Sequence, residues 1–247
     1  MSKRQLHQFV HIAGFGLQVA ASRKKNAHSL RGIIGEMMRQ PGHCPHVAAP
    51  RKPIQVFGTD PAALLAWIEE QHATQRLRGR RLRRDAWVAL VGVSSYPVPA
   101  DEVRDSMKEA KRLKIWQRAD VDWLRSRFGA SLRSVVLHTD EGFFHHHWVV
   151  TPDSLALTMD THPGHVAKRL VRAAGGETKA GNRAYCDAMR AWQDSYYDEV
   201  AGAFGWRRIS AAPRKHLSTA AVRAAVAAGD WIPGAGPVRM SAVNKPE

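Results

Sequence analysis

Residues 135–150 read VVLHTDEGFFHHHWVV, and this stretch decides the fold that we predict. Two runs of strand length, 134–138 and 145–150, flank a short acidic loop at 139–144. Apolar runs separated by a tight polar loop are typical of two antiparallel strands. The stretch therefore predicts a β-hairpin that carries several histidines.

The spacing of these histidines predicts where their side chains point. Side chains alternate between the two faces of a strand, so His145 and His147 share a face while His146 points to the other. A tight return places His138 on the neighbouring strand, opposite this pair. Neutral imidazole binds manganese, zinc, iron, nickel and copper, and three histidines leave positions open for water or a substrate oxygen. The hairpin thus predicts a metal site suited to phosphate chemistry.

Two acids, Asp140 and Glu141, stand in the loop beside these ligands. A carboxylate there could complete the metal shell, orient a histidine or accept a proton. Alternatives are a solvated histidine patch with turn-forming acids, or a closed structural zinc site, which the lack of a nearby cysteine makes less suitable. The group His43, Cys44 and His46 also has side chains that could bind a metal. Because no fourth ligand follows at the spacing of a zinc finger, we interpret the group as a proline-constrained loop.

Outward from the hairpin, strand and helix patterns alternate along the chain. We expect further strands at 5–12, 54–57 and 86–93, and helices at 19–39, from Pro61 onward, within 100–128, at 163–174 and at 182–204. This order predicts an α+β domain over residues 1–212, with a mostly antiparallel sheet, the histidine hairpin at its centre and helices packed on it, segregated on one side. Residues 213–247 are expected to form a basic tail containing Ala, Gly and Pro.

The composition points to a polyanionic partner. The chain has 247 residues, with 37 Lys and Arg against 22 Asp and Glu, for a net charge of +15. A field of this sign attracts nucleic acid. Its 44% hydrophobic content excludes a wholly disordered or fibrous chain. Two distant cysteines, no signal-peptide pattern and no apolar stretch of roughly 20 residues predict a cytoplasmic protein without a membrane segment.

The histidine hairpin resembles a known motif. The pattern His138-x-Asp140-Glu141-x-x-x-His145-x-His147 is similar to the metal motif of the MobV (Mob/Pre, plasmid recombination) relaxases, which belong to the HUH endonucleases. The element at 28–31, His-Ser-Leu-Arg, is similar to the His-x-x-Arg element that these relaxases carry on an early helix. The family usually has Thr-Pro where this chain has Phe143-Phe144.

The resemblance implies an HUH-type fold and a relaxase activity, in which one DNA strand is cut at a transfer origin and its 5′ phosphate stays attached to the enzyme. It implies that His28 is the nucleophile and forms a phosphohistidine. It also implies that Mn²⁺ or Mg²⁺ is held by the three hairpin histidines, His138, His145 and His147. Glu141 would be a fourth ligand or would orient His28, and Asp140 would support the ligands from behind. Arg31 would contact the phosphate or be a surface arginine.

The implied partner is single-stranded or melted origin-of-transfer DNA, together with other relaxosome proteins, in mobilisation, recombination or replication. Basic side chains would follow the phosphates, namely Arg23, Lys24, Lys25, Arg76, Arg78, Arg80, Arg81, Arg83 and Arg84. Phe143 and Phe144 could stack bases, whereas Trp87 fits better in the core. Alternatives are a non-catalytic DNA-binding regulator on the same fold, and a tyrosine-type replication initiator that uses Tyr196 or Tyr197.

Overall fold

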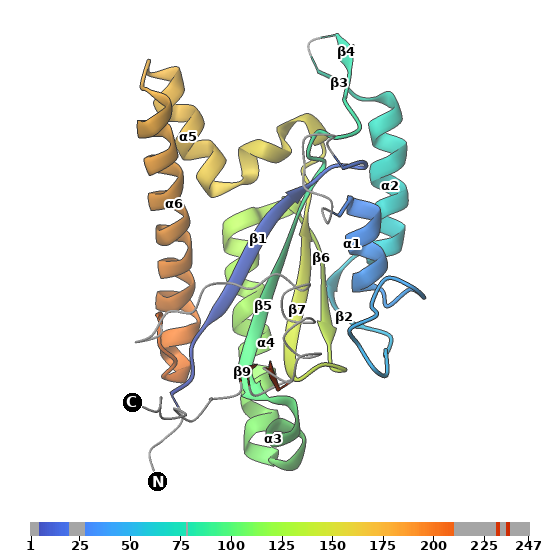
Figure 1. Cartoon of the computed structure of the whole chain (residues 1–247), viewed down its shortest axis with the longest axis vertical. Coiled ribbons are helices and arrows are strands. Elements are labelled where there is room, and N and C mark those ends of the chain that lie inside the picture. Colours follow the sequence, from blue (N-terminus) through green and yellow to red (C-terminus); the bar gives the residue numbers. More distant parts are fainter. Residues whose placement is uncertain (1–4, 20–27, 78, 210–230, 233–235, 238–247) are drawn as a thin grey trace, which may run out of the picture. The chain divides into compact units, whose positions relative to one another are not determined.

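A five-stranded antiparallel sheet with the strand order β1-β5-β7-β6-β2 forms the centre of the molecule (Figure 1). In the computed structural model, the described residues are 5–19, 28–77, 79–209, 231–232 and 236–237. The strands of the sheet are β1 (Phe9–Phe15), β2 (Ile54–Gly58), β5 (Ala89–Pro99), β6 (Leu132–His138) and β7 (Phe143–Val150). Because β7 is the middle strand and pairs with β6, the predicted histidine hairpin lies at the centre of the sheet.

The helices follow the predicted order. They are α1 (Leu30–Met37), α2 (Pro61–Thr74), α3 (Ala100–Asp105), α4 (Met107–Phe128), α5 (Pro163–Ala173) and α6 (Thr178–Glu199), with short 3₁₀ turns η1 (Gly129–Ser131), η2 (Leu155–Thr161) and η3 (Ala201–Phe204). A small hairpin, β3 (Arg76–Leu77) and β4 (Arg80–Arg81), follows α2. Asp60 begins α2 as predicted, because its carboxylate accepts the amide hydrogens of Ala62 and Ala63. Within the described ranges, no helix is long and apolar enough to cross a membrane.

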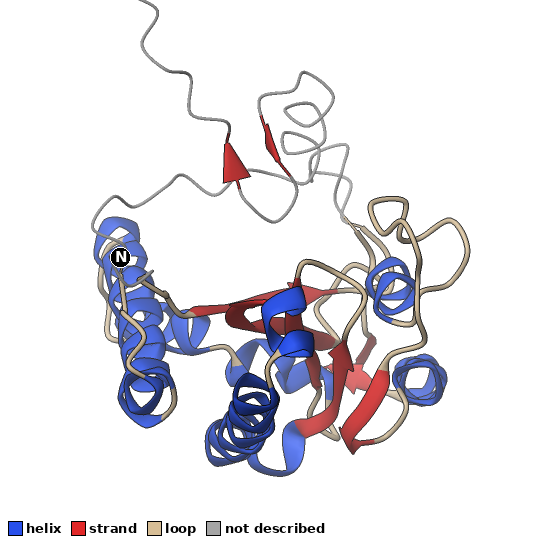
Figure 2. Cartoon of the chain, turned by 90° about the horizontal axis from the view of Figure 1, so that it is seen from below, coloured by secondary structure: helices blue, strands red, loops and turns tan. Residues whose placement is uncertain are grey.

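Helices cover both faces of the sheet, so the expectation that they gather on one side is wrong. Figure 1 shows α1 and α2 beside β2, α4 behind the sheet, and α5 with α6 beyond β1; Figure 2 shows helices grouped around the sheet. One buried cluster joins alternate strand residues such as Leu90 and Trp148 to α4 and α6. The other joins Val91 and Val149 to α1 and α2. Because successive side chains of β5 enter different cores, the first part of this strand has a near-continuous apolar sequence.

Several element boundaries differ from the prediction, among them those of the last long helix, which spans Thr178–Glu199 instead of 182–204. The first strand is Phe9–Phe15 instead of 5–12, and the third runs on to Pro99. The helix expected over 19–39 spans only Leu30–Met37, because the Ser29 hydroxyl caps its first turn by accepting the Gly32 amide hydrogen at 3.3 Å. Residues 20–27 of that expected helix lie outside the described residues.

The chain divides into two compact units, Met1–Arg208 and Ile209–Glu247. The first contains the five-stranded sheet and all the helices named above. The second contains the short strand pair β8 (Trp231–Ile232) and β9 (Gly236–Pro237).

Candidate metal centre

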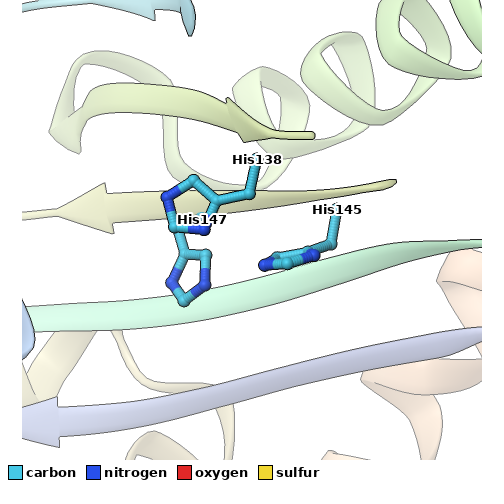
Figure 3. Close-up of side chains that lie close together, drawn as sticks. All are labelled: His138, His145 and His147. Atoms are coloured by element: carbon cyan, nitrogen blue, oxygen red, sulfur yellow. The ribbon is translucent and has the colours of Figure 1, made fainter. Parts of the chain in front are cut away.

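The three predicted ligands meet on one face of the hairpin (Figure 3). His138 ends β6 and pairs with His145 of β7 in the register, and His147 follows two residues later. The ring centroid of His138 lies 5.0 Å from that of His145 and 4.6 Å from that of His147. One ligand atom from each ring lies within 4.8 Å of the other two. The alternation of the strand therefore brings the trio together.

Main-chain carbonyls fix two of the rings and leave the other nitrogens free to ligate. His138 Nε2 lies 2.8 Å from the carbonyl oxygen of Met37, and His145 Nδ1 lies 2.9 Å from that of Phe143. A carbonyl oxygen only accepts, so these nitrogens carry the ring hydrogen and the opposite nitrogen keeps its lone pair. Metal-binding histidines are commonly oriented in this way.

Two buried nitrogens of the trio lack a partner. Among the described residues, His138 Nδ1 and His147 Nδ1 have no hydrogen bond although water cannot reach them. Leaving a buried polar nitrogen unsatisfied costs about 1–3 kcal/mol. A cation bound by these two nitrogens and by His145 would remove that cost. The donor set therefore fits a divalent metal ion.

Burial keeps the trio neutral. It lowers the pKa of His138 to about 4, with a further contribution from the neighbouring His145. Burial also lowers the pKa of His145, and lowers that of His147 well below its ordinary value. The three rings are therefore unprotonated near pH 7, the form in which imidazole binds a metal.

An arginine that the sequence did not reveal holds the two acids of the loop. Arg39 donates from Nε and Nη2 to the two oxygens of Asp140, at 2.9 and 2.8 Å, and from Nη2 to Glu141 Oε1 at 2.5 Å. Burial raises the pKa of both carboxyls, but the hydrogen bonds and charges around them outweigh it, so both pKa values lie below their ordinary range. Asp140 and Glu141 form a second group of possible ligands with His138, and Glu141 Oε1 also lies 3.5 Å from His145 Nε2.

His28 and Arg31 lie at the start of α1, whereas the trio contacts the end of this helix. His28 precedes the Ser29 cap of α1, whereas Met37, whose carbonyl binds His138, is the last residue of the same helix. An eight-residue helix is about 12 Å long, so the structure places His28 and the trio at opposite ends of α1. Arg31 forms an ion pair with Glu69 of α2.

Another histidine lies at the end of α1 that contacts the trio. His46 Nε2 is 3.7 Å from a carboxylate oxygen of Glu36, in the last turn of α1. The charge of His46 also contributes to lowering the pKa of Glu141. The group of His43, Cys44 and His46 is absent from the clusters of the described residues that could hold a metal ion.

His146 points to the opposite face, as predicted, and is enclosed there. It is fully buried, its Nδ1 lies 2.7 Å from Asp120 Oδ2, and its ring stacks on that of Trp116 of α4 with centroids 4.7 Å apart. Consecutive histidines of β7 thus serve different surroundings: His145 and His147 face the candidate centre, and His146 anchors the strand to α4.

The arginines predicted to contact DNA differ in whether their side chains already bind other groups of the protein. Arg76 donates to the carbonyls that end α2, and Arg83 forms a two-pronged pair with Asp85. Arg81 and Arg84, with Arg31, Glu69 and His72, line a cavity of about 610 Å³. Arg80 is exposed. The remaining predicted contacts, Arg23, Lys24, Lys25 and Arg78, lie outside the described residues.

Burial argues against two aromatic interpretations and supports a third. Phe144 is only 6% exposed and packs in the core, so it does not offer a face for stacking bases. Trp87 packs against the same core, as expected. Tyr196 is completely buried, and its hydroxyl accepts the indole hydrogen of Trp116 at 3.0 Å. A side chain enclosed in this way cannot attack DNA as the tyrosine of an initiator would.

Solved structures similar to this chain are those of one relaxase domain. The MobM relaxase domain (MOBV; Mob_Pre), Mn-bound and bound to 23 nucleotides of plasmid pMV158 oriT DNA, matches with a TM-score of 0.51 and 12% identity over 90% of this chain and 98% of that chain. Two further MobM–oriT DNA structures match with TM-scores of 0.48 and 0.47, at 10% and 14% identity, over 87% and 89% of this chain and 98% of each of theirs. No protein-family model and no curated protein matches the sequence.

An antiparallel sheet whose central hairpin gathers three histidines, with helices on both faces, defines an α+β fold of the relaxase type. More particularly, the chain has the fold of the MobM relaxase domain. The fold that the hairpin motif predicted is therefore confirmed.

Proposed function

We propose that this chain is a metal-dependent, site-specific relaxase that nicks and rejoins one strand of plasmid or mobile-element DNA in the cytoplasm, through a domain over residues 1–212. One observation carries the proposal. Three neutral imidazoles, two of them with an orphaned buried nitrogen, meet at the central hairpin of a MobM-type sheet. The MobM domain with this fold is described as Mn-bound and bound to oriT DNA, which supports a divalent ion and single-stranded or melted origin DNA as ligands here.

His138, His145 and His147 would hold the ion, Mn²⁺ or Mg²⁺, with Glu141 as a fourth ligand or an orienting group. When bound, such an ion neutralises charge that builds up on the scissile phosphate. The chain supplies the rest of the site. Neutral rings bind a cation without first releasing protons, and main-chain carbonyls hold two of the rings in place.

The covalent step in this proposal is a nucleophilic substitution at phosphorus that gives a phosphoramidate. A neutral histidine nitrogen forms a bond to phosphorus, and the bond from phosphorus to the 3′ oxygen breaks. The leaving oxygen takes up a proton while the attacking ring loses its N–H proton. The product is a 5′-phosphohistidine, and the reverse reaction rejoins the strand. The sequence resemblance favours His28 as the nucleophile, with Arg31 near the phosphate, whereas placement beside the last turn of α1 favours His46.

Mapping the adduct tests both nucleophiles. The full chain is incubated with Mn²⁺ and supercoiled plasmid that carries its adjacent DNA, and the peptide attached to the 5′ end is identified by mass spectrometry. We expect a relaxed product and an adduct that either His28→Ala or His46→Ala abolishes, while DNA affinity stays nearly unchanged. His165→Ala, on α5, is the matched control. An adduct that survives both variants would place the nucleophile elsewhere.

Two other outcomes have clear meanings. DNA binding without a nick under any divalent metal would contradict the enzyme and favour a non-catalytic DNA-binding regulator. An adduct on Tyr197 would favour the tyrosine-type initiator. If the chain is a relaxase, the exposed arginines Arg80, Arg81 and Arg84 contact the DNA backbone, together with Arg23, Lys24, Lys25 and Arg78. Other relaxosome proteins would assemble on the same DNA.

A further inference from the structure

The backbone of Arg39 adopts a conformation that arginine rarely adopts. Its φ angle is +57°, and no other non-glycine residue in the described part of the chain has a positive φ. It follows Met38, the C-cap of α1, and therefore occupies the position where helices commonly end with glycine or asparagine. A residue with a β-carbon pays roughly 1 kcal/mol or more in this region. Such a conformation persists where the surroundings fix it, which directs attention to the side chain.

The side chain of Arg39 is held at four points. It is 3% exposed. Besides its two bonds to Asp140 and one to Glu141, its Nη1 donates to the carbonyl oxygen of Glu36 at 3.4 Å. Asp140 is fixed from a third direction by the amide of Arg51 at 2.9 Å. The guanidinium therefore joins the end of α1 to the turn of the histidine hairpin, residues that are 101 positions apart.

The hydrogen bonds of Arg39 leave one oxygen of Glu141 available to a metal ion. Arg39 occupies both oxygens of Asp140 and one oxygen of Glu141. The bonded oxygen of Glu141 is also the one that lies 3.5 Å from His145 Nε2. Resting on the proposed function, we propose that Arg39 is a positioning residue of the metal centre, which acts by holding Glu141 beside the ligand histidines.

Charge alone would give Arg39 the opposite effect. A guanidinium beside a divalent cation repels it, so removal of the positive charge should tighten binding if electrostatics were its only influence. Loss of an orienting group behind metal ligands instead weakens binding, typically about 10- to 100-fold. The direction of the change therefore separates the two roles.

The test is a calorimetric titration of the full chain with Mn²⁺ alone. We expect Arg39→Lys, which keeps the charge but loses the planar fork, and Arg39→Gln, which loses both, to bind Mn²⁺ at least about tenfold more weakly than wild type. Arg133→Lys is the matched control, because Arg133 lies on the same strand as His138 and is bound to Asp153 and to the Thr151 carbonyl. Unchanged or tighter binding in folded Arg39 variants would overturn the inference.

A double-mutant cycle keeps the inference falsifiable if Arg39→Gln fails to fold. Since Arg39 is proposed to act through Glu141, Arg39→Lys should have little further effect on Mn²⁺ affinity in the Glu141→Gln background. An equal loss in both backgrounds would overturn the positioning role and leave only a structural one. Wild-type protein that binds no Mn²⁺ would contradict the metal centre and the proposed function, whereas normal wild-type binding with insensitive Arg39 variants would contradict this inference alone.

Discussion

The three consecutive histidines of β7 have different roles, and His146 differs from the other two. Its neighbours on β7 face the candidate centre, whereas His146 is buried against Asp120 and Trp116 on the other face. Removing one partner of such a pair leaves an unpaired polar group in a medium of low polarizability, which is costly. The strand alternation that predicted its direction from the sequence could not predict Asp120, which lies 26 positions earlier on α4.

We therefore expect Asp120→Ala to lower the free energy of unfolding by about 3 kcal/mol without changing Mn²⁺ affinity of the folded protein. Asp120→Asn, which can still accept the hydrogen bond, should cost less. His145→Ala should show the converse, with lost Mn²⁺ binding. Urea unfolding and calorimetry measure the two quantities. Loss of Mn²⁺ binding in folded Asp120→Ala would show that the two faces of β7 are not independent.

We expect His162 to make the stability of the fold depend on pH. It is 1% exposed at the N-cap of α5, where its ring accepts the His165 amide hydrogen. Burial, and then the charges of His165 and His11, lower its pKa to about 4. The ordinary pKa of about 6.5 applies in the unfolded chain, so the unfolded state binds more protons between these two values. The free energy of unfolding therefore falls as the pH drops through this window.

The replacement His162→Asn should make that fall shallower, because asparagine still caps a helix but does not titrate. Urea unfolding at a series of pH values from about 7 to about 4 measures the slope. Arg133→Lys, which leaves every histidine in place, serves as a control with the wild-type slope. If His162→Asn and wild type lose stability in parallel, His162 contributes nothing to the pH dependence.

At the scale of elements, the basic stretch after α2 divides into different roles. A charge run in a sequence predicts contact with phosphate without distinguishing its members. In the structure, Arg83 is neutralised by Asp85, at 2.9 and 2.6 Å, while Arg81 and Arg84 line a cavity with His72. An arginine that is already paired with a carboxylate neutralises phosphate less effectively, so its contact with DNA releases fewer of the counterions bound to the DNA.

We expect the double variant Arg81→Ala and Arg84→Ala to reduce the salt dependence of single-stranded DNA binding by about 1.4 log units per tenfold salt, at about 0.7 per phosphate contact. The matched control Arg83→Ala should bind with a nearly wild-type slope. Fluorescence anisotropy with a labelled oligonucleotide at several salt concentrations measures both. Equal slopes in wild type and the double variant would remove this cavity from the DNA interface.

Local patterns predicted the elements that carry the site, and long-range packing determined the rest. The hairpin followed from alternation between His138 and His147, and the start of α2 followed from Asp60 and its proline. By contrast, the Arg39 clamp joins residues about a hundred positions apart, and no local pattern encodes that contact. Only the continuous apolar run at the start of β5 indicated helices on both faces of the sheet. A strand that is covered on one face alone would instead alternate apolar and polar residues.

At the scale of the whole molecule, charge and site belong largely to the same unit. Met1–Arg208 contains both buried clusters and the candidate centre. Residues 213–247 contain five Lys or Arg and two Asp or Glu, so they contribute only +3 of the net charge of +15. The electrostatic attraction for DNA should therefore reside mainly in the preceding residues.

A chain that ends at residue 212 tests this division. Because every element of the sheet and both cores are retained, we expect cooperative unfolding and Mn²⁺ affinity equal to those of the full chain, and most of the salt dependence of DNA binding to remain. The full chain is the reference in each measurement. A truncated chain that binds Mn²⁺ normally but has lost most of its DNA affinity would move the principal DNA contact into the tail, and the arginines around the cavity would then have to be assigned another partner.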